Sequence, residues 1–277
     1  MQRYFIQLSY DGTSYHGWQI QPNGISVQET VEKVLSVVSR DNISLTGAGR
    51  TDAGVHASFY VAHFDTVNQD LDNEKIIHSL NCLLAPDIAV QSVFKVGNES
   101  HARFSAISRT YKYFLIKSKD PFSRLYADRA VRIPDLEMMN EAAKKLFNYQ
   151  DFTSFSRLGS NVTTNICKID LAEWSDQGNS YVFTIRADRF LRNMVRAIAG
   201  TLLEVGYAKI STEEFCNIIE AKDRCAAGTS VPAKGLFLVD IAYPEELSRG
   251  IIRSVNDPGS KSPKRQVPED VTFPNHS

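Results

Sequence analysis

Residues 47–57 read GAGRTDAGVHA, a glycine-rich stretch that holds a single acid, Asp52. Gly47, Gly49 and Gly54 permit turns and a close approach of ligand to backbone that side chains would block. The following residues, FYVAHF at 59–64, are apolar and β-branched or aromatic, which predicts a strand rather than a helix. The stretch therefore predicts an acid on a tight loop that leads directly into a buried strand.

Three familiar uses of glycine-rich or histidine-bearing loops do not fit this stretch. A dinucleotide fingerprint, G-x-G-x-x-G, needs its third glycine where Asp52 stands, and a phosphate-binding P-loop needs a Gly-Lys-Ser/Thr that is missing. A metal site built from His16, His56, His63 and His101 lacks H-x-x-x-H or H-E-x-x-H spacing. What remains is the carboxylate itself.

A carboxylate in such a loop can serve chemistry or structure. The neighbouring guanidinium of Arg50 would favour the ionised form of Asp52, and an ionised carboxylate is a competent nucleophile or base without a cofactor. The alternative is a turn in which Asp52 caps backbone amides, a common use of Asp among glycines. Both uses are open at this point.

Outward from the loop, the first hundred residues predict strand, helix, strand, helix, strand, over 4–10, 26–38, 59–64, 73–84 and 88–96. The first helix opens with a capping box, Ser26 and Glu29, and its apolar positions form one stripe. The same order returns later as strand 110–116, helix 135–147, hairpin strands 168–174 and 181–187, helix 190–205, a short helix opened by Ser211 and Glu214, and strand 235–243.

Each half therefore resembles a split βαβ unit, and we predict an α+β fold with a mixed, largely antiparallel sheet and a cleft between the halves. The expected division is 1–105 for the half with the Asp52 loop, 106–247 for the other half, and 248–277 for a disordered tail, because five of the ten prolines lie past residue 243.

Composition is that of an ordinary globular chain, with 277 residues, 43% hydrophobic and 23% charged. The four cysteines are far apart and contain no C-x-x-C, so we expect reduced, buried packing residues. The N-terminus alternates like a strand, and no apolar run approaches a membrane span. We expect a soluble, cytoplasmic protein.

Charge is segregated along the chain although the net charge is only −1. Residues 100–134 contain eight basic and two acidic side chains, with aromatic residues between them, and 186–196 contain four arginines and one aspartate. Such stretches could follow a phosphate backbone. The alternative is a solvated strand face.

The loop is one of a series of motifs that together resemble the tRNA pseudouridine synthase A family. The others occur in order between residues 4 and 243: YDG at 10–12, YHGWQ at 15–19, SVQ at 26–28, HARFSA at 101–106, RTY at 109–111, DFTSF at 151–155, FLRNMVR at 190–196 and GLFL at 235–238.

The resemblance implies isomerisation of uridine to pseudouridine in the anticodon stem-loop of tRNA, at positions 38–40, without metal or organic cofactor. It implies Asp52 as the nucleophile, and leaves open whether the carboxylate attacks C1′ or C6 or abstracts a ribose proton. It also implies a homodimer whose subunits jointly hold one tRNA.

Further site residues follow from the same resemblance. Tyr111 would bind the substrate base, although a core strand tyrosine explains it equally. Arg196 would pair with Asp52, or else contact a phosphate. Leu236 would line the pocket, although period-2 strand packing also accounts for it. We hypothesise an RNA-binding cleft lined by Arg103, Lys112, Arg189 and Arg192.

Two rival functions can be stated from sequence. A non-catalytic RNA-binding protein of the RRM type would share the split βαβ units, but the RRM signature is absent and the Asp52 loop stays unexplained. A carboxylate-dependent hydrolase would need a second acid, for which Asp11 is the candidate.

Overall fold

The computed structural model describes residues 1–68, 70–157 and 164–253. The N-terminal half contains strands β1 (Gln2–Tyr10), β2 (Thr46–Gly47), β3 (His56–Thr66) and β4 (Ile88–Lys95), with helices α1 (Val27–Ser39) and α2 (Asn73–Leu83). The expected order of strand, helix, strand, helix, strand is confirmed, with β2 as an added short strand. The Asp52 loop does lead into a strand, which begins at His56 rather than Phe59.

The C-terminal half contains strands β5 (Ser108–Ile116), β6 (Asp128–Arg129), β7 (Ile169–Asp176), β8 (Ser180–Ala187) and β9 (Leu236–Ala242). Its helices are α3 (Leu136–Lys145), α4 (Met194–Gly206) and α5 (Thr212–Glu220), with 3-10 turns at Leu146–Asn148, Thr153–Phe155 and Ala233–Gly235, and α6 (Glu245–Ser248) follows β9.

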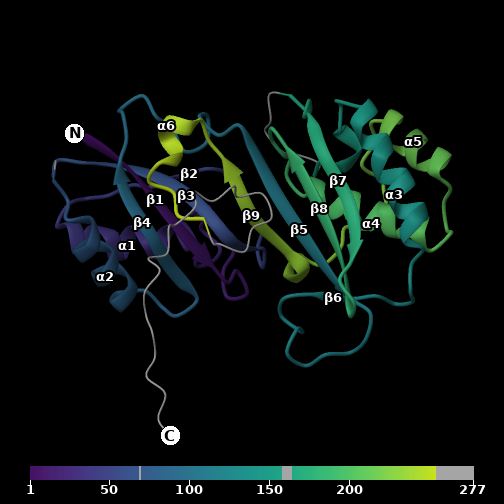
Figure 1. The fold of residues 1–277 in the computed structure, drawn as a ribbon, viewed down its shortest axis with the longest axis horizontal. Helices are drawn as coiled ribbons and strands as arrows, with labels where there is room; N and C mark the ends of the chain where they lie inside the picture. Colours follow the sequence, from purple (N-terminus) through teal and green to yellow (C-terminus); the bar gives the residue numbers. More distant parts are fainter. Residues whose placement is uncertain (69, 158–163, 254–277) are drawn as a thin grey trace, which may run out of the picture.

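One sheet of nine strands runs through both halves of the described chain, in the order β4-β1-β3-β9-β5-β8-β7, with β2 beside β3 and β6 beside β5 (Figure 1). The pairs β3–β9 and β5–β6 are parallel and the other pairs are antiparallel. The predicted α+β fold with a mixed, largely antiparallel sheet is therefore confirmed.

The halves meet through β9, which is added from the C-terminal half against β3 of the N-terminal half. Leu236 at the start of β9 belongs to the core of the C-terminal half, whereas Leu238 and Ile241 pack in the core of the N-terminal half. Tyr111 on β5 contacts both cores. We call the junction between β3 and β9 the seam. Each half therefore completes its core with side chains near this seam.

The helices that cover the two halves begin at different kinds of cap. In α1 the Ser26 hydroxyl accepts the Glu29 N–H at 3.2 Å without the reciprocal bond of a capping box, whereas Ser211 and Glu214 of α5 form both bonds. Helix α4 begins at Met194 instead of residue 190, because Asn193 has φ +67° and cannot be part of the helix. A turn closed by the bond from Met194 N–H to Leu191 O, at 3.1 Å, precedes the helix.

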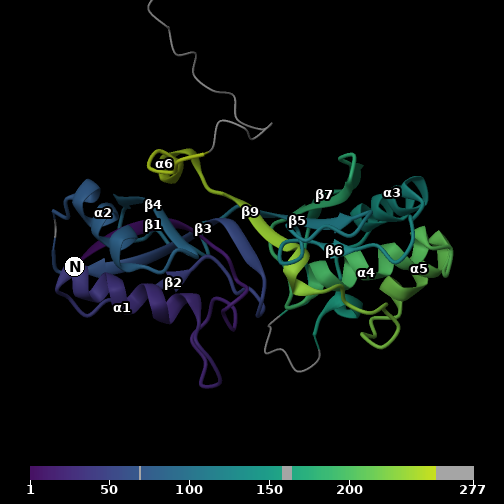
Figure 2. The ribbon, with the colours of Figure 1, turned by 90° about the horizontal axis from the view of Figure 1, so that it is seen from below.

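Figure 2 shows α1 and α4 on one face of the sheet and α6 on the other. The segment after α6 packs on that second face: the Gln7 side chain, which is buried in β1, donates to Ile252 O at 2.7 Å and accepts Ile252 N–H at 2.8 Å. Ser92 donates to Gly250 O at 2.6 Å. Residues 248–253, which we assigned to the expected disordered tail, are thus bound to the sheet, and the rest of that segment lies outside the described residues.

Two smaller expectations have mixed outcomes. All four cysteines are free, but Cys82 and Cys225 are exposed and Cys216 is half-buried, so the expected burial holds only for Cys167. Among the described residues, no helix combines the length and the apolar character needed to cross a bilayer.

Candidate active site

The loop that carries Asp52 is held by buried aromatic residues of the N-terminal half. The Tyr60 hydroxyl donates to Gly49 O at 2.5 Å, and the Tyr10 hydroxyl shares a hydrogen bond of 2.9 Å with Thr51 Oγ1. Both tyrosines are buried, and the backbone N–H of Trp18 donates to Thr51 O at 3.4 Å. Because these partners lie in the core, the backbone on the N-terminal side of Asp52 is fixed.

Two glycines let this loop turn closely against its neighbours. Gly17 has φ +82°, and a Cβ there would lie 2.2 Å from Thr51 O. Gly54 has φ +77° and donates its N–H to Tyr15 O at 3.3 Å. Side chains at either position would strain the loop, since the left-handed region disfavours residues with a Cβ.

Asp52 is paired with arginines that come from the other half of the molecule. Its Oδ2 accepts from Arg196 Nη1 at 3.2 Å, and its Oδ1 lies 3.8 Å from Arg192 Nε. The carboxylate is 22% exposed. Arg50, by contrast, is exposed, and among the ion pairs of the described chain it is not a partner of Asp52. The guanidinium beside Asp52 is therefore that of Arg196 and not of its sequence neighbour Arg50.

Arg196 lies in the first turn of α4 and is itself held on both sides. Its Nε donates to Val231 O at 2.8 Å, and its backbone O accepts the Val231 N–H at 3.2 Å. Asn193, just before the helix, donates to Ser230 Oγ at 2.6 Å. These bonds tie the start of α4 to residues 230–231, so that the Arg196 guanidinium has little freedom to leave Asp52.

Tyr111 lies in β5 opposite Leu238 of β9 and is partly exposed. Its ring packs edge-on against Phe190, with 5.2 Å between centroids. Burial raises the pKa of Tyr111 to about 12; the Arg109 cation opposes this rise and the Asp52 carboxylate adds to it. Tyr111 is therefore within electrostatic reach of Asp52, and its hydroxyl is protonated at neutral pH.

Leu236 and Leu238 are buried at the seam, 5% and 2% exposed. Leu236 pairs with Tyr113, and Leu238 with Tyr111, across the β5–β9 ladder. Strand packing accounts for both leucines, and the assignment of Leu236 to a pocket wall stays a prediction.

The four candidate RNA-binding cations have different surroundings. Arg103 is exposed and its guanidinium lies 5.6 Å from the exposed Phe104 ring. Arg192 is also exposed, with 53% of its side chain accessible, whereas Lys112 and Arg189 are half-buried. All four have some access to solvent, and only Arg192 lies against Asp52.

Sequence reasoning missed Arg109, which joins the basic segment to the Asp52 loop. Its Nη2 donates to Arg103 O at 2.5 Å and to Ala48 O at 3.1 Å, and its Nη1 donates to Asp188 O at 2.8 Å. A guanidinium bonded to carbonyls of three segments fixes their relative positions. The RTY motif contained this residue, but charge counting treated it as one more surface cation.

Asp11, the candidate second acid of a hydrolase, is occupied by neighbours. Burial acts against ionisation, but hydrogen bonds from Thr13 and Tyr126 hold the pKa of Asp11 below its usual value. Its Oδ1 also lies 3.0 Å from His56 Nδ1. A carboxylate with these partners is poorly suited to donate a proton, so the hydrolase alternative loses its acid.

The histidines considered as metal ligands take other roles. His63 accepts the Ala102 N–H at 3.1 Å, and His101 accepts the N–H groups of Arg103 and Phe104 at 3.1 and 3.3 Å. In residues 1–68, 70–157 and 164–253, no three His, Cys, Asp or Glu side chains come together as metal ligands would.

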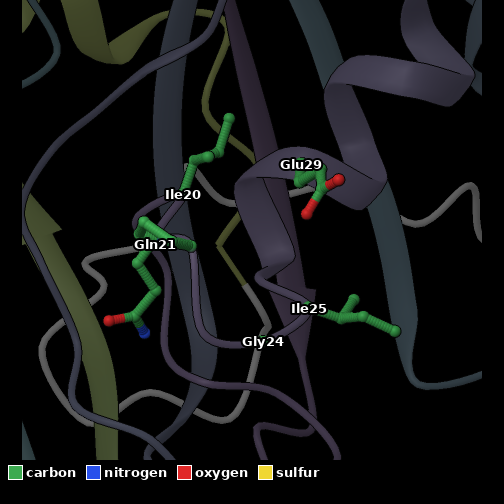
Figure 3. A pocket seen from close by; sticks show the side chains of 6 residues that line it. Ile20, Gln21, Gly24, Ile25 and Glu29 are labelled. Carbon is green, nitrogen blue, oxygen red and sulfur yellow. The ribbon is translucent and has the colours of Figure 1, made fainter.

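An open surface hollow of about 540 Å³ lies beside the loop of residues 18–25, which precedes α1 (Figure 3). An antiparallel β-bridge pairs Gln21 with Gly24 in this loop, and the side chains of Ile20 and Ile25 are exposed. The lining of the hollow consists of Ile20, Gln21, Pro22, Gly24, Ile25 and Glu29. None of the predicted site residues lines it.

Comparisons with known proteins show the family to which this chain belongs. A family model described as tRNA pseudouridine synthase matches residues 7–105 and 142–244. A tRNA pseudouridine synthase A of Bacteroides fragilis is 57% identical over 248 residues, 89% of this chain and 98% of that protein. Proteins of the same name are 58% identical in Bacteroides thetaiotaomicron (89% of this chain and 93% of that protein) and 41% identical in Bacillus subtilis (85% and 97%). By both the family model and these relatives, the chain belongs to the tRNA pseudouridine synthase family.

Proposed function

We propose that this protein is an isomerase that converts uridine to pseudouridine in tRNA, with Asp52 as the nucleophile and without a metal or organic cofactor. The observation that supports it most directly is the pairing of the Asp52 carboxylate with Arg196 at 3.2 Å across the seam of the two halves. A non-catalytic RNA-binding protein would not need this pair, and the named relatives are synthases.

The reaction needs a group that supports cleavage and re-formation of a glycosidic bond. The C1′–N1 bond breaks, the uracil turns, C1′ joins C5, and the C5 proton leaves. Asp52 can attack C1′ or C6, or take a ribose proton. In each case Arg196 fixes the orientation of the carboxylate, because its guanidinium is bonded both to Asp52 and to Val231 O.

On this proposal Tyr111 binds the base that reacts. The Tyr111 side chain is partly exposed and its ring lies beside Phe190. Its hydroxyl is protonated, so it can both donate and accept a hydrogen bond. We assign it to stacking on the target uracil and to assisting departure of the C5 proton. Leu236 would contact the apolar edge of the same base.

The substrate on this proposal is the anticodon stem-loop, at positions 38–40. A stacked base is out of reach of a side chain, so the uridine must be extruded, at a cost of a few kcal/mol. Phosphate contacts from Arg103, Lys112, Arg189 and Arg192 would offset that cost. A homodimer whose subunits jointly hold one tRNA, acting in the cytoplasm, completes the proposal.

Release of tritium from tRNA labelled at C5 of uridine tests the reaction. The wild-type protein should release label, and Asp52→Asn should release none above background. Asp65→Asn is a matched control, because Asp65 lies on β3 and is paired with Arg3 at 2.7 Å. Full release by Asp52→Asn, or no release by wild type from any tRNA with uridine at 38–40, would contradict the proposal.

Two measurements test the finer parts. Pseudouridine mapping in tRNAs that carry a single uridine at 38, 39 or 40 gives the positions modified; product only outside this stretch would overturn the assignment to the anticodon stem-loop. Sedimentation of the protein with and without tRNA gives the subunit number, for which we expect two protein chains and one tRNA.

A further inference from the structure

His56 is the first residue of β3, four residues after Asp52, and is 1% exposed. Its Nδ1 accepts the Gly12 N–H at 3.1 Å. Its Nε2 lies 3.2 Å from Leu125 O and 3.1 Å from Lys234 O. A neutral imidazole that accepts at Nδ1 carries its proton on Nε2, so this N–H is shared between the two carbonyls.

The bonds to Leu125 and Lys234 do not depend on one protonation state. The Asp11 carboxylate lies 3.0 Å from Nδ1 and would accept a proton placed there. In the imidazolium, Nδ1 donates to Asp11 in place of accepting from Gly12, and Nε2 still carries its proton. In both states, therefore, Nε2 donates to the carbonyls of Leu125 and Lys234.

These two carbonyls belong to the C-terminal half, whereas Gly12 and Asp11 belong to the N-terminal half. The direct backbone pairing of the halves between β3 and β9 consists of two residue pairs, His56 with Phe237 and Ala57 with Leu238. The Phe237 ring also stacks on the imidazole, 4.5 Å between centroids and 22° between planes. His56 thus joins the halves through both its backbone and its side chain, at the point where the Asp52 loop ends.

The position of this joint matters because the halves contribute different parts of the site. Asp52 comes from the N-terminal half, and Arg196 and Tyr111 come from the C-terminal half. A displacement of about 1 Å between reacting groups can reduce a rate by roughly 100-fold. The Asp52–Arg196 contact of 3.2 Å therefore requires that the loop and α4 keep fixed positions relative to each other.

We propose that His56 is a positioning residue: by sharing its Nε2–H between Leu125 O and Lys234 O, it fixes the Asp52 loop of one half against the pocket residues of the other. This inference rests on the proposed function of Asp52 for its kinetic consequence. The structural part, that the imidazole restrains the loop, can be measured without the reaction.

Two substitutions separate the two sides of the imidazole. In His56→Asn the amide reaches the position of Nδ1 and can keep a bond to Gly12, but it is too short to donate to Leu125 and Lys234. In His56→Gln an amide N–H reaches toward those carbonyls. We expect kcat for tritium release to fall roughly 100-fold in His56→Asn at nearly unchanged KM, and about 5-fold in His56→Gln. Equal kcat values for the two variants would overturn the proposal.

His63→Gln is the matched control, because His63 is also a buried β3 histidine that accepts a backbone N–H, but its bond stays within the N-terminal half. We expect its kcat to match wild type. A loss as large as that of His56→Asn would show a general effect of buried histidines and would count against a special role of His56. If His56→Asn does not fold, Phe237→Leu tests the joint: it removes the stacked ring and should lower kcat about 5-fold; an unchanged kcat contradicts the proposal.

Amide hydrogen exchange provides the readout that is independent of catalysis. The N–H groups of Gly54 and Val55 are bonded to Tyr15 O and Asp52 O, and their exchange reports opening of the loop. We expect exchange to quicken about 10-fold in His56→Asn and to stay near wild type in His56→Gln. Equal exchange in all three proteins overturns the proposal even if the reaction assay succeeds. If wild type releases no tritium, the proposed function fails while this comparison still decides the role of His56.

Discussion

Helices α1 and α4 are both thirteen residues long and both lie on the same face of the sheet, one in each half (Figure 2). In α1 the buried residues are Val27, Gln28, Val31 and Leu35, and the other nine are half-buried or exposed. In α4 eleven of the thirteen residues are buried, and both α3 and α5 pack against it. The C-terminal half thus encloses α4 more fully than the N-terminal half encloses α1.

The difference explains how each half holds its share of the site. The N-terminal half holds the Asp52 loop with buried tyrosines: Tyr10 is bonded to the Thr51 hydroxyl, and Tyr60 is bonded to the Gly49 carbonyl. The C-terminal half fixes Arg196 by building it into an enclosed helix and bonding it to Val231. Since the carboxylate and its cation come from different halves, neither half alone contains the Asp52–Arg196 pair.

The largest effect on activity is expected from removal of the Arg196 cation. Arg196→Met keeps a long side chain in the enclosed helix but takes away the partner of Asp52. We expect kcat for tritium release to fall at least roughly 100-fold, because the carboxylate loses the group that orients it. Steady-state kinetics on C5-labelled tRNA measure this. A fall of less than 5-fold would mean that the carboxylate is oriented from its own half alone.

The enclosed helix can be displaced without touching a charged residue. Gly200 lies in the middle of α4, and a Cβ there would lie 2.0 Å from Thr229 O, two residues before the carbonyl that holds Arg196. We expect Gly200→Ala to lower the free energy of unfolding by about 3 kcal/mol and to lower kcat as well. The control is Gly97→Ala in the N-terminal half, where a Cβ would have ordinary contacts, 3.7 Å from Ser100 Oγ. Equal melting of the two variants would contradict the tight enclosure of α4.

Acid should act on the N-terminal half first, because the histidines of the described chain all lie before residue 106. Burial, helped by the Arg3 and His101 charges, lowers the pKa of His63 to about 4. A histidine whose folded pKa lies below its unfolded value of about 6.5 gives stability that is present above pH 6.5 and is lost as pH falls toward 4. We expect roughly 2 kcal/mol to be lost by pH 5. Urea unfolding at pH 7 and 5 measures the loss, and His63→Gln should reduce it; an unchanged difference would contradict this assignment.

The fold was predictable because both halves use strong local signals. Ser211 and Glu214 form the expected capping box, and the alternation of β-branched and aromatic residues located most of the strands. The sequence pattern predicts the start of α4 four residues too early, because residues 190–193 continue the apolar and basic character of the helix. Only the left-handed backbone of Asn193 excludes them, and no side-chain pattern announces that conformation.

The site was predictable as a set of residues and not as a set of contacts. Arg50 is expected beside Asp52 because it is close in sequence, yet its side chain is exposed, and the described ion pairs of Asp52 are with Arg192 and Arg196. Arg196 could be assigned only through the family motif, since 144 residues separate it from Asp52. Contacts across the seam depend on how β9 pairs with β3, which local patterns do not encode.

The smallest expected effect concerns tRNA binding by exposed basic residues of the two halves. Arg192 represents the C-terminal half, and Lys33 on α1 represents the N-terminal half. Arg192 lies 3.8 Å from Asp52 with 53% of its side chain accessible, and Lys33 is 73% accessible and paired with Glu29. If the C-terminal half supplies the phosphate contacts near the site, Arg192→Ala should weaken tRNA binding several-fold and reduce the slope of log K against log salt by about 1, whereas Lys33→Ala should change neither. Titrations of tRNA at several salt concentrations measure both. Equal slopes for the two variants would mean that Arg192 serves Asp52 alone and that the RNA is held by other cations of the seam.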